Sequence, residues 1–312
     1  MSQTSGFIVL EHQGMLSVRG TDAAKFLQGQ LTCNLNYVSY DQSSLGARCN
    51  PKGRIQSTFR LAMQGDGFLL SMSRDLVEKQ FTELKKFAMF SKSTLLDESA
   101  DWVQLGLIRP EPILHELGIE LADKAGAVTQ HNDLLAIRIS PELAELWLPA
   151  SGASCSIRQL ASNVEEKTLS DWQLELIRCG MYQVTAQSYE AHIPQILNLP
   201  ALDGVSFKKG CYSGQEIVAR MQYLGKQKRH MQRFLASGTQ LPEPGTSLLF
   251  DDGSKAGEVL TAALSPDGVE LLAIAPVDVT QEQGLYLDLA ERLPLTLASL
   301  PYTIDIEREI QR

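Results

Sequence analysis

Cys211 lies in a segment whose residue types can make a thiol reactive. Two lysines precede it and two glycines flank it, in the run Lys208-Lys209-Gly210-Cys211-Tyr212-Ser213-Gly214-Gln215-Glu216. Such glycines indicate a tight turn or a close approach of the backbone to another group. Residues 215–221 favour a helix, so we expect Cys211 at or just before a helix N-terminus, where the helix dipole and the lysines stabilise a thiolate. The alternative is a cysteine that only packs.

The remaining cysteines give no sign of a disulfide framework or a metal site. The chain has five, Cys33, Cys49, Cys155, Cys179 and Cys211. Because the number is odd and the spacings are long, we expect free thiols in a reducing compartment. No two of them form a short ligand pair and the histidines are scattered, so we assign no metal. The N-terminus has no basic, apolar leader and no apolar run reaches about 18 residues, so we expect a cytoplasmic protein.

Positive charge gathers around the same segment, although the chain as a whole carries a formal charge of −9. Between residues 208 and 233, seven basic residues stand against one acid, Glu216; they are Lys208, Lys209, Arg220, Lys226, Lys228, Arg229 and Arg233. The pattern predicts an anion site, either for the tail of a small ligand or for RNA phosphate. The alternative is an ordinary solvated face.

Hydrophobic periodicity predicts the elements that position this segment. Strands are expected at 7–18, 54–63, 68–72, 102–108, 134–139 and 143–148. Helices are expected at 22–27, with Thr21 as N-cap, and at 74–90, 111–117 and 171–179. The run Gln64-Gly65-Asp66-Gly67 predicts a hairpin turn. A long loop, 181–205, leads to the cysteine segment, and loops of that length are more often functional than accidental.

Beyond about residue 232 the chain changes character. Short apolar stretches alternate with the turn signals Pro242-Glu243-Pro244-Gly245, Asp251-Asp252-Gly253 and Ser265-Pro266-Asp267-Gly268. Short, regularly spaced strands of this kind are typical of a small barrel or sandwich. The sequence therefore predicts an α+β protein with a domain at 1–231 and a small C-terminal β domain, a barrel or a sandwich, at 232–312.

The cysteine segment also resembles the signature of a known family. Lys-Gly-Cys-Tyr-x-Gly-Gln-Glu, which stands here at Lys209 to Glu216, is similar to the signature of the YgfZ family of folate-binding, glycine-cleavage-T-protein-like proteins. Further segments resemble the family in the same order, at 26–32, 51–54, 83–92, 193–199 and 205–211. The resemblance therefore extends over nearly the whole chain.

The resemblance implies a T-protein-like fold, with folate-binding α/β lobes around a central cavity and a C-terminal barrel. It implies tetrahydrofolate or a derivative as ligand, and a role in the assembly or repair of iron–sulfur enzymes, some of which thiolate tRNA. Cys211 would be a reactive thiol near the folate, in a loop formed with Lys209, Gly210, Tyr212, Gly214, Gln215, Glu216 and Arg220. The basic patch would suit the polyglutamate tail of a folate better than RNA, because the remaining surface is acidic.

Three positions bear on the expected folate site. Trp172 matches a tryptophan of the family and offers a flat face to a pterin, although a core position in its helix is the alternative. Arg178 replaces a glutamate that often follows this helix in the family. Gln13 falls where the family has a second tryptophan, so we do not expect a two-sided aromatic clamp.

The T-protein places an aspartate near the folate, and the matching residues 53–59 contain no carboxylate. Gln, Ser and Thr cannot replace its charge or its proton-accepting role, so we expect no aminomethyltransferase activity. Whether the protein is an enzyme stays open. The leading hypothesis is a folate-binding factor for iron–sulfur enzymes that holds no stable cluster itself. The alternatives are a one-carbon transferase with an unknown acceptor and a direct tRNA-binding module; no membrane partner is expected.

Overall fold

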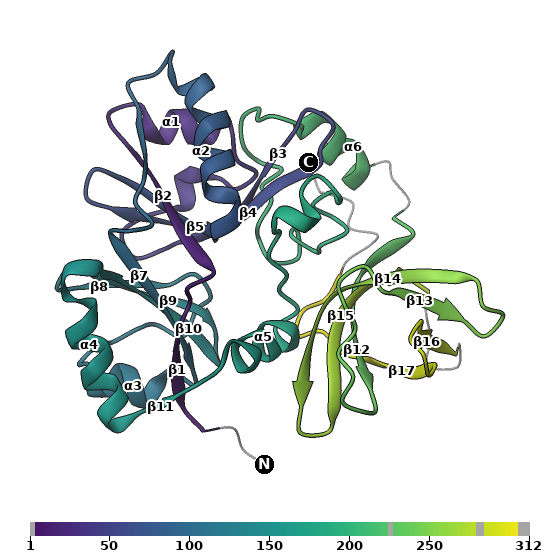
Figure 1. The fold of residues 1–312 in the computed structure, drawn as a ribbon. Helices are drawn as coiled ribbons and strands as arrows, with labels where there is room; N and C mark the ends of the chain where they lie inside the picture. The colour runs from purple at the N-terminus through teal and green to yellow at the C-terminus, as the bar shows by residue number, and fades with distance from the viewer. Residues whose placement is uncertain (1–3, 224–226, 279–283, 305–312) are drawn as a thin grey trace. The chain divides into compact units, whose positions relative to one another are not determined.

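The computed structural model describes residues 4–223, 227–278 and 284–304 (Figure 1). None of the helices within these ranges is both long enough and apolar enough to cross a membrane. The chain forms two compact units whose segments alternate along the sequence. The first contains 4–168, 183–192 and 203–216, and the second contains 169–182, 193–202 and 217–304. The boundary predicted near residue 232 falls inside the first barrel strand, whereas the last segment of the second unit begins at residue 217 and that unit also takes two earlier segments.

The first sheet of the first unit has five antiparallel strands in the order β3-β4-β5-β2-β6. Their bounds are β2 Gln13–Arg19, β3 Ser44–Cys49, β4 Ile55–Gln64, β5 Gly67–Ser73 and β6 Thr94–Asp97. The predicted hairpin is confirmed, since Gln64 pairs with Gly67 across the turn. The single strand expected at 7–18 is divided between β1 and β2 by a turn at Glu11 and His12.

Two helices, α1 (Ala23–Gln28) and α2 (Arg74–Ala88), cover one face of this sheet (Figure 1). Side chains alternate across a strand, so Phe59 and Leu61 of β4 point to the helices and are buried in a common core with them. Burial of each such side chain is worth about 1.5–3 kcal/mol. The residue before α1 is Asp22, and no side chain caps that end, so the expectation of a Thr21 cap was wrong. A short 3₁₀ turn, η1 (Leu35–Tyr37), follows α1.

The second sheet of this unit has six strands in the order β11-β1-β7-β10-β9-β8. Their bounds are β1 Gly6–Val9, β7 Trp102–Ile108, β8 Val128–His131, β9 Leu134–Ser140, β10 Leu143–Pro149 and β11 Glu165–Glu166. Apolar residues of these strands share a core with α3 (Glu111–Glu116) and α4 (Ala150–Asn163). The sequence predicts β7, α3, β9 and β10 to within a few residues, but not α4.

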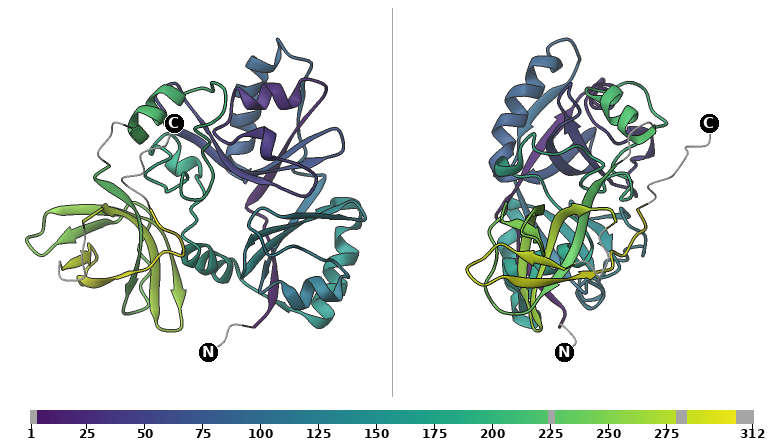
Figure 2. Two further views of the ribbon diagram at one scale, coloured as in Figure 1. Left: turned by 180° about the vertical axis from the view of Figure 1, so that it is seen from behind. Right: turned by 90° about the vertical axis from the view of Figure 1, so that its right-hand side faces the viewer.

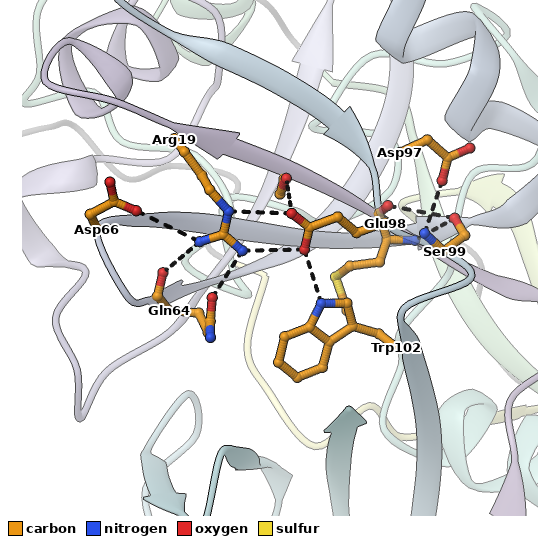
Figure 3. Close-up of polar contacts among 9 residues, drawn as sticks. Arg19, Gln64, Asp66, Asp97, Glu98, Ser99 and Trp102 are labelled. Atoms are coloured by element: carbon orange, nitrogen blue, oxygen red, sulfur yellow. Dashed lines mark hydrogen bonds and ion pairs between the residues drawn. The ribbon is translucent and has the colours of Figure 1, made fainter. Parts of the chain in front are cut away.

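Glu98 lies in the turn between β6 and β7 and joins elements of both sheets (Figure 3). Its carboxylate accepts hydrogen bonds from Ser17 Oγ at 2.6 Å, Trp102 Nε1 at 3.0 Å and Arg19 at 3.2 Å, and Arg19 also donates to Gln64. Burial alone would raise the pKa of Glu98, but these hydrogen bonds outweigh it and lower the pKa. This carboxylate is fully engaged in the fold, so we assign it no chemistry.

The second unit is built on a closed barrel with the strand order β12-β15-β14-β13-β16-β17, which confirms the predicted barrel (Figure 2). The bounds are β12 Arg229–Ala236, β13 Ser247–Phe250, β14 Lys255–Ser265, β15 Gly268–Pro276, β16 Leu285–Leu287 and β17 Leu293–Ala298. Helix α5 (Leu169–Arg178) packs against β14 and β15. Gln173 of this helix donates a hydrogen bond to Thr261 of β14.

Candidate functional site

Cys211 is exposed at the tip of its loop. Two other cysteines, Cys33 and Cys49, are buried, and burial raises their pKa to about 11 and about 12 respectively. Their thiols are therefore protonated at neutral pH and enclosed by protein. Cys155 is also exposed, on α4, and Cys179 is partly buried. Exposure and neighbouring residue types together single out Cys211 as the candidate reactive thiol.

Lys209 anchors the Cys211 loop to the end of α1 and the segment that follows it. Its Nζ lies 2.7 Å from the carbonyl oxygen of Gln28, 2.6 Å from that of Leu31 and 2.8 Å from that of Cys33. An ammonium group has three N–H donors, so these carbonyls use all of them. Burial lowers the pKa of Lys209 to about 8. We expected Lys209 to stabilise a Cys211 thiolate. In the structure its ammonium group instead donates its hydrogen bonds to backbone carbonyls.

Two further contacts hold the same loop to the first unit. The amide of Ser206 donates to the carbonyl of Thr32 at 2.9 Å, and Thr32 Oγ1 donates to the carbonyl of Gly204 at 2.6 Å. Gly214 has φ +81°, and a Cβ there would lie 2.4 Å from the carbonyl oxygen of Asn50. Only glycine fits that position. We expected a close backbone approach at Gly210 as well, but a Cβ there would meet nothing within 4 Å.

The loop closes on itself before the helix begins. The Tyr212 amide donates to the side chain of Gln215 at 3.2 Å, and the Gln215 amide donates to the Tyr212 carbonyl at 3.1 Å. Helix α6 (Gln215–Tyr223) starts only there, so Cys211 precedes the helix by a short turn. Tyr212 is buried, whereas Glu216 and Arg220 are exposed on α6. Lys209, Tyr212, Gly214 and Gln215 therefore shape the loop.

The predicted basic patch is used in part for internal contacts. Lys209 is anchored to carbonyls, and Arg233 forms an ion pair with the buried Glu270 at 2.6 Å. Lys208, Arg220, Lys228 and Arg229 are exposed. Lys226 lies outside the described residues. These basic residues are shared between the two units, so the anion site stays a prediction.

Comparison with known proteins places the chain in a family. No family model matches it. It is 32% identical over 305 residues to the tRNA-modifying protein YgfZ of Escherichia fergusonii, an alignment that covers 96% of this chain and 93% of the relative. It is 33% identical over 306 residues to the protein of the same name from Yersinia enterocolitica, covering 95% and 92%. The chain belongs to the YgfZ family.

The fold of this YgfZ family member is that of the glycine cleavage T-protein. Aminomethyltransferase T from Bartonella henselae matches with a TM-score of 0.77, covering 95% of this chain and 86% of that protein. The identity between the two is 18%, so the likeness concerns the fold alone. The predicted fold class is therefore confirmed.

The expected pterin contact, Trp172, is only 2% exposed on α5. A pterin could stack on this indole only if the surrounding packing opened, so the contact stays a prediction. Arg178, at the end of the same helix, pairs with Glu175 at 2.9 Å and with Glu270 of β15 at 2.7 Å. The base that replaces the family's glutamate therefore has a structural partner in the barrel.

Gln13 also has a structural partner where the family carries its second tryptophan. Its side-chain amide and that of Gln183 exchange two hydrogen bonds, of 2.7 and 2.9 Å. This pair ties β2 to the 183–192 segment. An amide pair therefore stands where we expect no second aromatic ring.

The structure also brings together residues that sequence reasoning missed. Gln56, inside the segment that lacks the T-protein's acid, donates to Tyr189 Oη at 2.9 Å and to Glu190 Oε1 at 2.8 Å. A carboxylate is therefore present beside this segment, although it comes from the loop that precedes the cysteine segment. No local pattern predicts it; the unusual length of the 181–205 loop was the only signal.

Proposed function

We propose that this protein binds tetrahydrofolate or a derivative and supports the assembly or repair of iron–sulfur enzymes, including enzymes that thiolate tRNA. Cys211 is the reactive thiol of this activity. Membership of the YgfZ family, the T-protein fold and the tRNA-modifying name of the relatives support the proposal. The observation that carries it is the exposed Cys211 on a loop that Lys209, Thr32 and Gly214 fix in place.

Two alternatives differ in their support. One-carbon transfer to an unknown acceptor gains from Glu190, a carboxylate beside the segment that otherwise has none. Direct tRNA binding loses support, because Lys209 and Arg233 of the basic patch are used within the fold. The maintenance role needs no carboxylate as a catalyst, and an exposed thiol on a fixed loop fits it best.

Substitution of Cys211 tests the proposed role in cells. In a strain that lacks the gene, Cys211→Ala is expected to restore less than a tenth of the iron–sulfur enzyme activity and tRNA thiolation that the wild type restores, because the nucleophile and metal ligand is lost. Cys155→Ala removes the other fully exposed thiol and should restore both. Full activity with Cys211→Ala would refute the thiol role.

A further inference from the structure

The Gln56 side chain is hydrogen-bonded to Glu190 beside the start of β4. The Gln56 side chain is only 7% exposed, and both N–H groups of its amide are used, by Tyr189 Oη and Glu190 Oε1. Its Oε1 is buried and has no partner among the described residues. A buried amide oxygen without a donor is unfavourable, so the amide keeps this orientation because its two N–H groups are held by Tyr189 and Glu190.

The backbone of Glu190 is held in an uncommon conformation. Its φ is +57°, in the left-handed region that glycine adopts more readily than glutamate. The Glu190 amide donates to the Ile55 carbonyl at 2.8 Å, and Arg54 donates to the Ala191 carbonyl at 2.6 Å. The start of β4 and the residue before it therefore fix this turn and with it the partly exposed carboxylate. A glutamate kept in a strained position is a candidate for a functional role.

Tyr189 fixes the orientation of the Gln56 amide. Burial and the nearby charges of Glu83 and Glu190 raise the pKa of Tyr189 to about 12, so its hydroxyl stays protonated. It donates a hydrogen bond to Glu83 at 3.2 Å. The same hydroxyl accepts from Gln56, and Lys79 Nζ lies 3.3 Å from the centre of the ring. Gln56 therefore turns its N–H groups to Tyr189 and Glu190, and its oxygen away from them.

This pair and the Cys211 loop border one segment, residues 50–56, within the first unit. Gly214 approaches the carbonyl of Asn50, and Glu190 is bonded to Ile55 and Gln56. A ligand held by Glu190 would therefore lie on the side of the first unit that carries the candidate thiol.

We propose that Glu190 binds the edge of a pterin that carries the 2-amino group and the ring N3–H, and that Gln56 positions this carboxylate. The inference rests on the proposed folate function and names a recognition residue for it. The two N–H donors of that edge lie side by side and match the two oxygens of a carboxylate, as an arginine fork does. Glu190 thus supplies the acid that Arg178 does not.

Calorimetric titration with two probes tests this assignment. One probe is 6-methyltetrahydropterin, and the other is its lumazine counterpart, in which oxygen replaces the 2-amino group. The wild type is expected to bind the pterin about tenfold or more tightly than the lumazine, because a charge-assisted hydrogen bond is lost with the amino group. Glu190→Gln should bind the pterin about tenfold more weakly and lose the preference, whereas Glu166→Gln, an exposed control on β11, should change neither affinity.

Glu190→Gly separates binding from folding, because glycine suits the left-handed backbone. It is expected to melt at least as high as the wild type and to bind the pterin about tenfold more weakly. If the wild type binds tetrahydrofolate and the Glu190 variants bind it equally well, the assignment of Glu190 is wrong and the folate proposal stands. If the wild type binds neither tetrahydrofolate nor the pterin, both are wrong.

Discussion

Lys209→Met is expected to release the Cys211 loop from the first unit and to lower the free energy of unfolding of that unit by about 3 kcal/mol. The methionine keeps the length of the side chain but donates nothing to the carbonyls of Gln28, Leu31 and Cys33. Hydrogen bonds to a charged group contribute about 1.5–3 kcal/mol each, and water can replace only part of them at this partly buried position.

Denaturant unfolding and amide hydrogen exchange measure this effect. Exchange should speed up at residues 28–36 and 205–215 in Lys209→Met, whereas the six-stranded sheet should keep its protection. Lys208→Met is the matched control, since Lys208 is the exposed neighbouring lysine and should change stability by no more than about 0.5 kcal/mol. Lys209→Arg should not rescue the loop, because a planar guanidinium cannot direct its donors at three converging carbonyls. Equal exchange in the two methionine variants would rule out the anchor.

Glu270→Gln is expected to destabilise the second unit by about 3 kcal/mol. Glu270 is 4% exposed and pairs with Arg178 of α5 at 2.7 Å and Arg233 of β12 at 2.6 Å. Removal of its charge leaves Arg233 without this carboxylate and Arg178 with Glu175 alone, and breaking a buried pair typically costs about 3–5 kcal/mol. Glu258→Gln, which removes an exposed partner of Lys255 from the same barrel, should cost less than about 1 kcal/mol.

The pH dependence of unfolding is a second test of the ion pairs that Glu270 forms with Arg178 and Arg233. Burial alone would raise the pKa of Glu270, but Arg178 and Arg233 outweigh it and lower the pKa below the ordinary value. The unfolded chain therefore takes up this proton first on acidification. The stabilisation is complete above the ordinary glutamate pKa of about 4.3 and is lost as the pH falls through the lower folded pKa. The wild type should lose stability more steeply than Glu270→Gln below about pH 4.3; parallel curves would show that Glu270 carries no such charge.

Elements with strong local patterns could be predicted from the sequence. The β4–β5 hairpin follows from alternating apolar residues around Gln64-Gly65-Asp66-Gly67, and α2 follows from apolar residues at helical spacing. Helix α4 escaped prediction because its Ser-rich sequence, with Gly152 near its start, has weak helix propensity. It is stabilised by tertiary packing of residues such as Ala153 and Leu160, which share a core with the six-stranded sheet.

Part of the candidate site could likewise be predicted from the sequence, and part could not. The motif around Cys211 could be recognised from the sequence, because its residue types are specific and adjacent. The use of Lys209 could not, because backbone carbonyls at Gln28, Leu31 and Cys33 leave no trace in the residue types. Glu190 was missed for a related reason, since it reaches Gln56 from a distant loop and only the folded chain brings the two together.

Alkylation of Cys211 with iodoacetamide, with and without saturating tetrahydrofolate, tests most directly whether the exposed thiol lies at a folate site. Peptide mass spectrometry resolves each cysteine, so the exposed Cys155 serves as an internal control in the same sample. We predict that tetrahydrofolate slows modification of Cys211 at least tenfold and leaves Cys155 unchanged. Equal rates at Cys211 with and without the ligand would contradict the account.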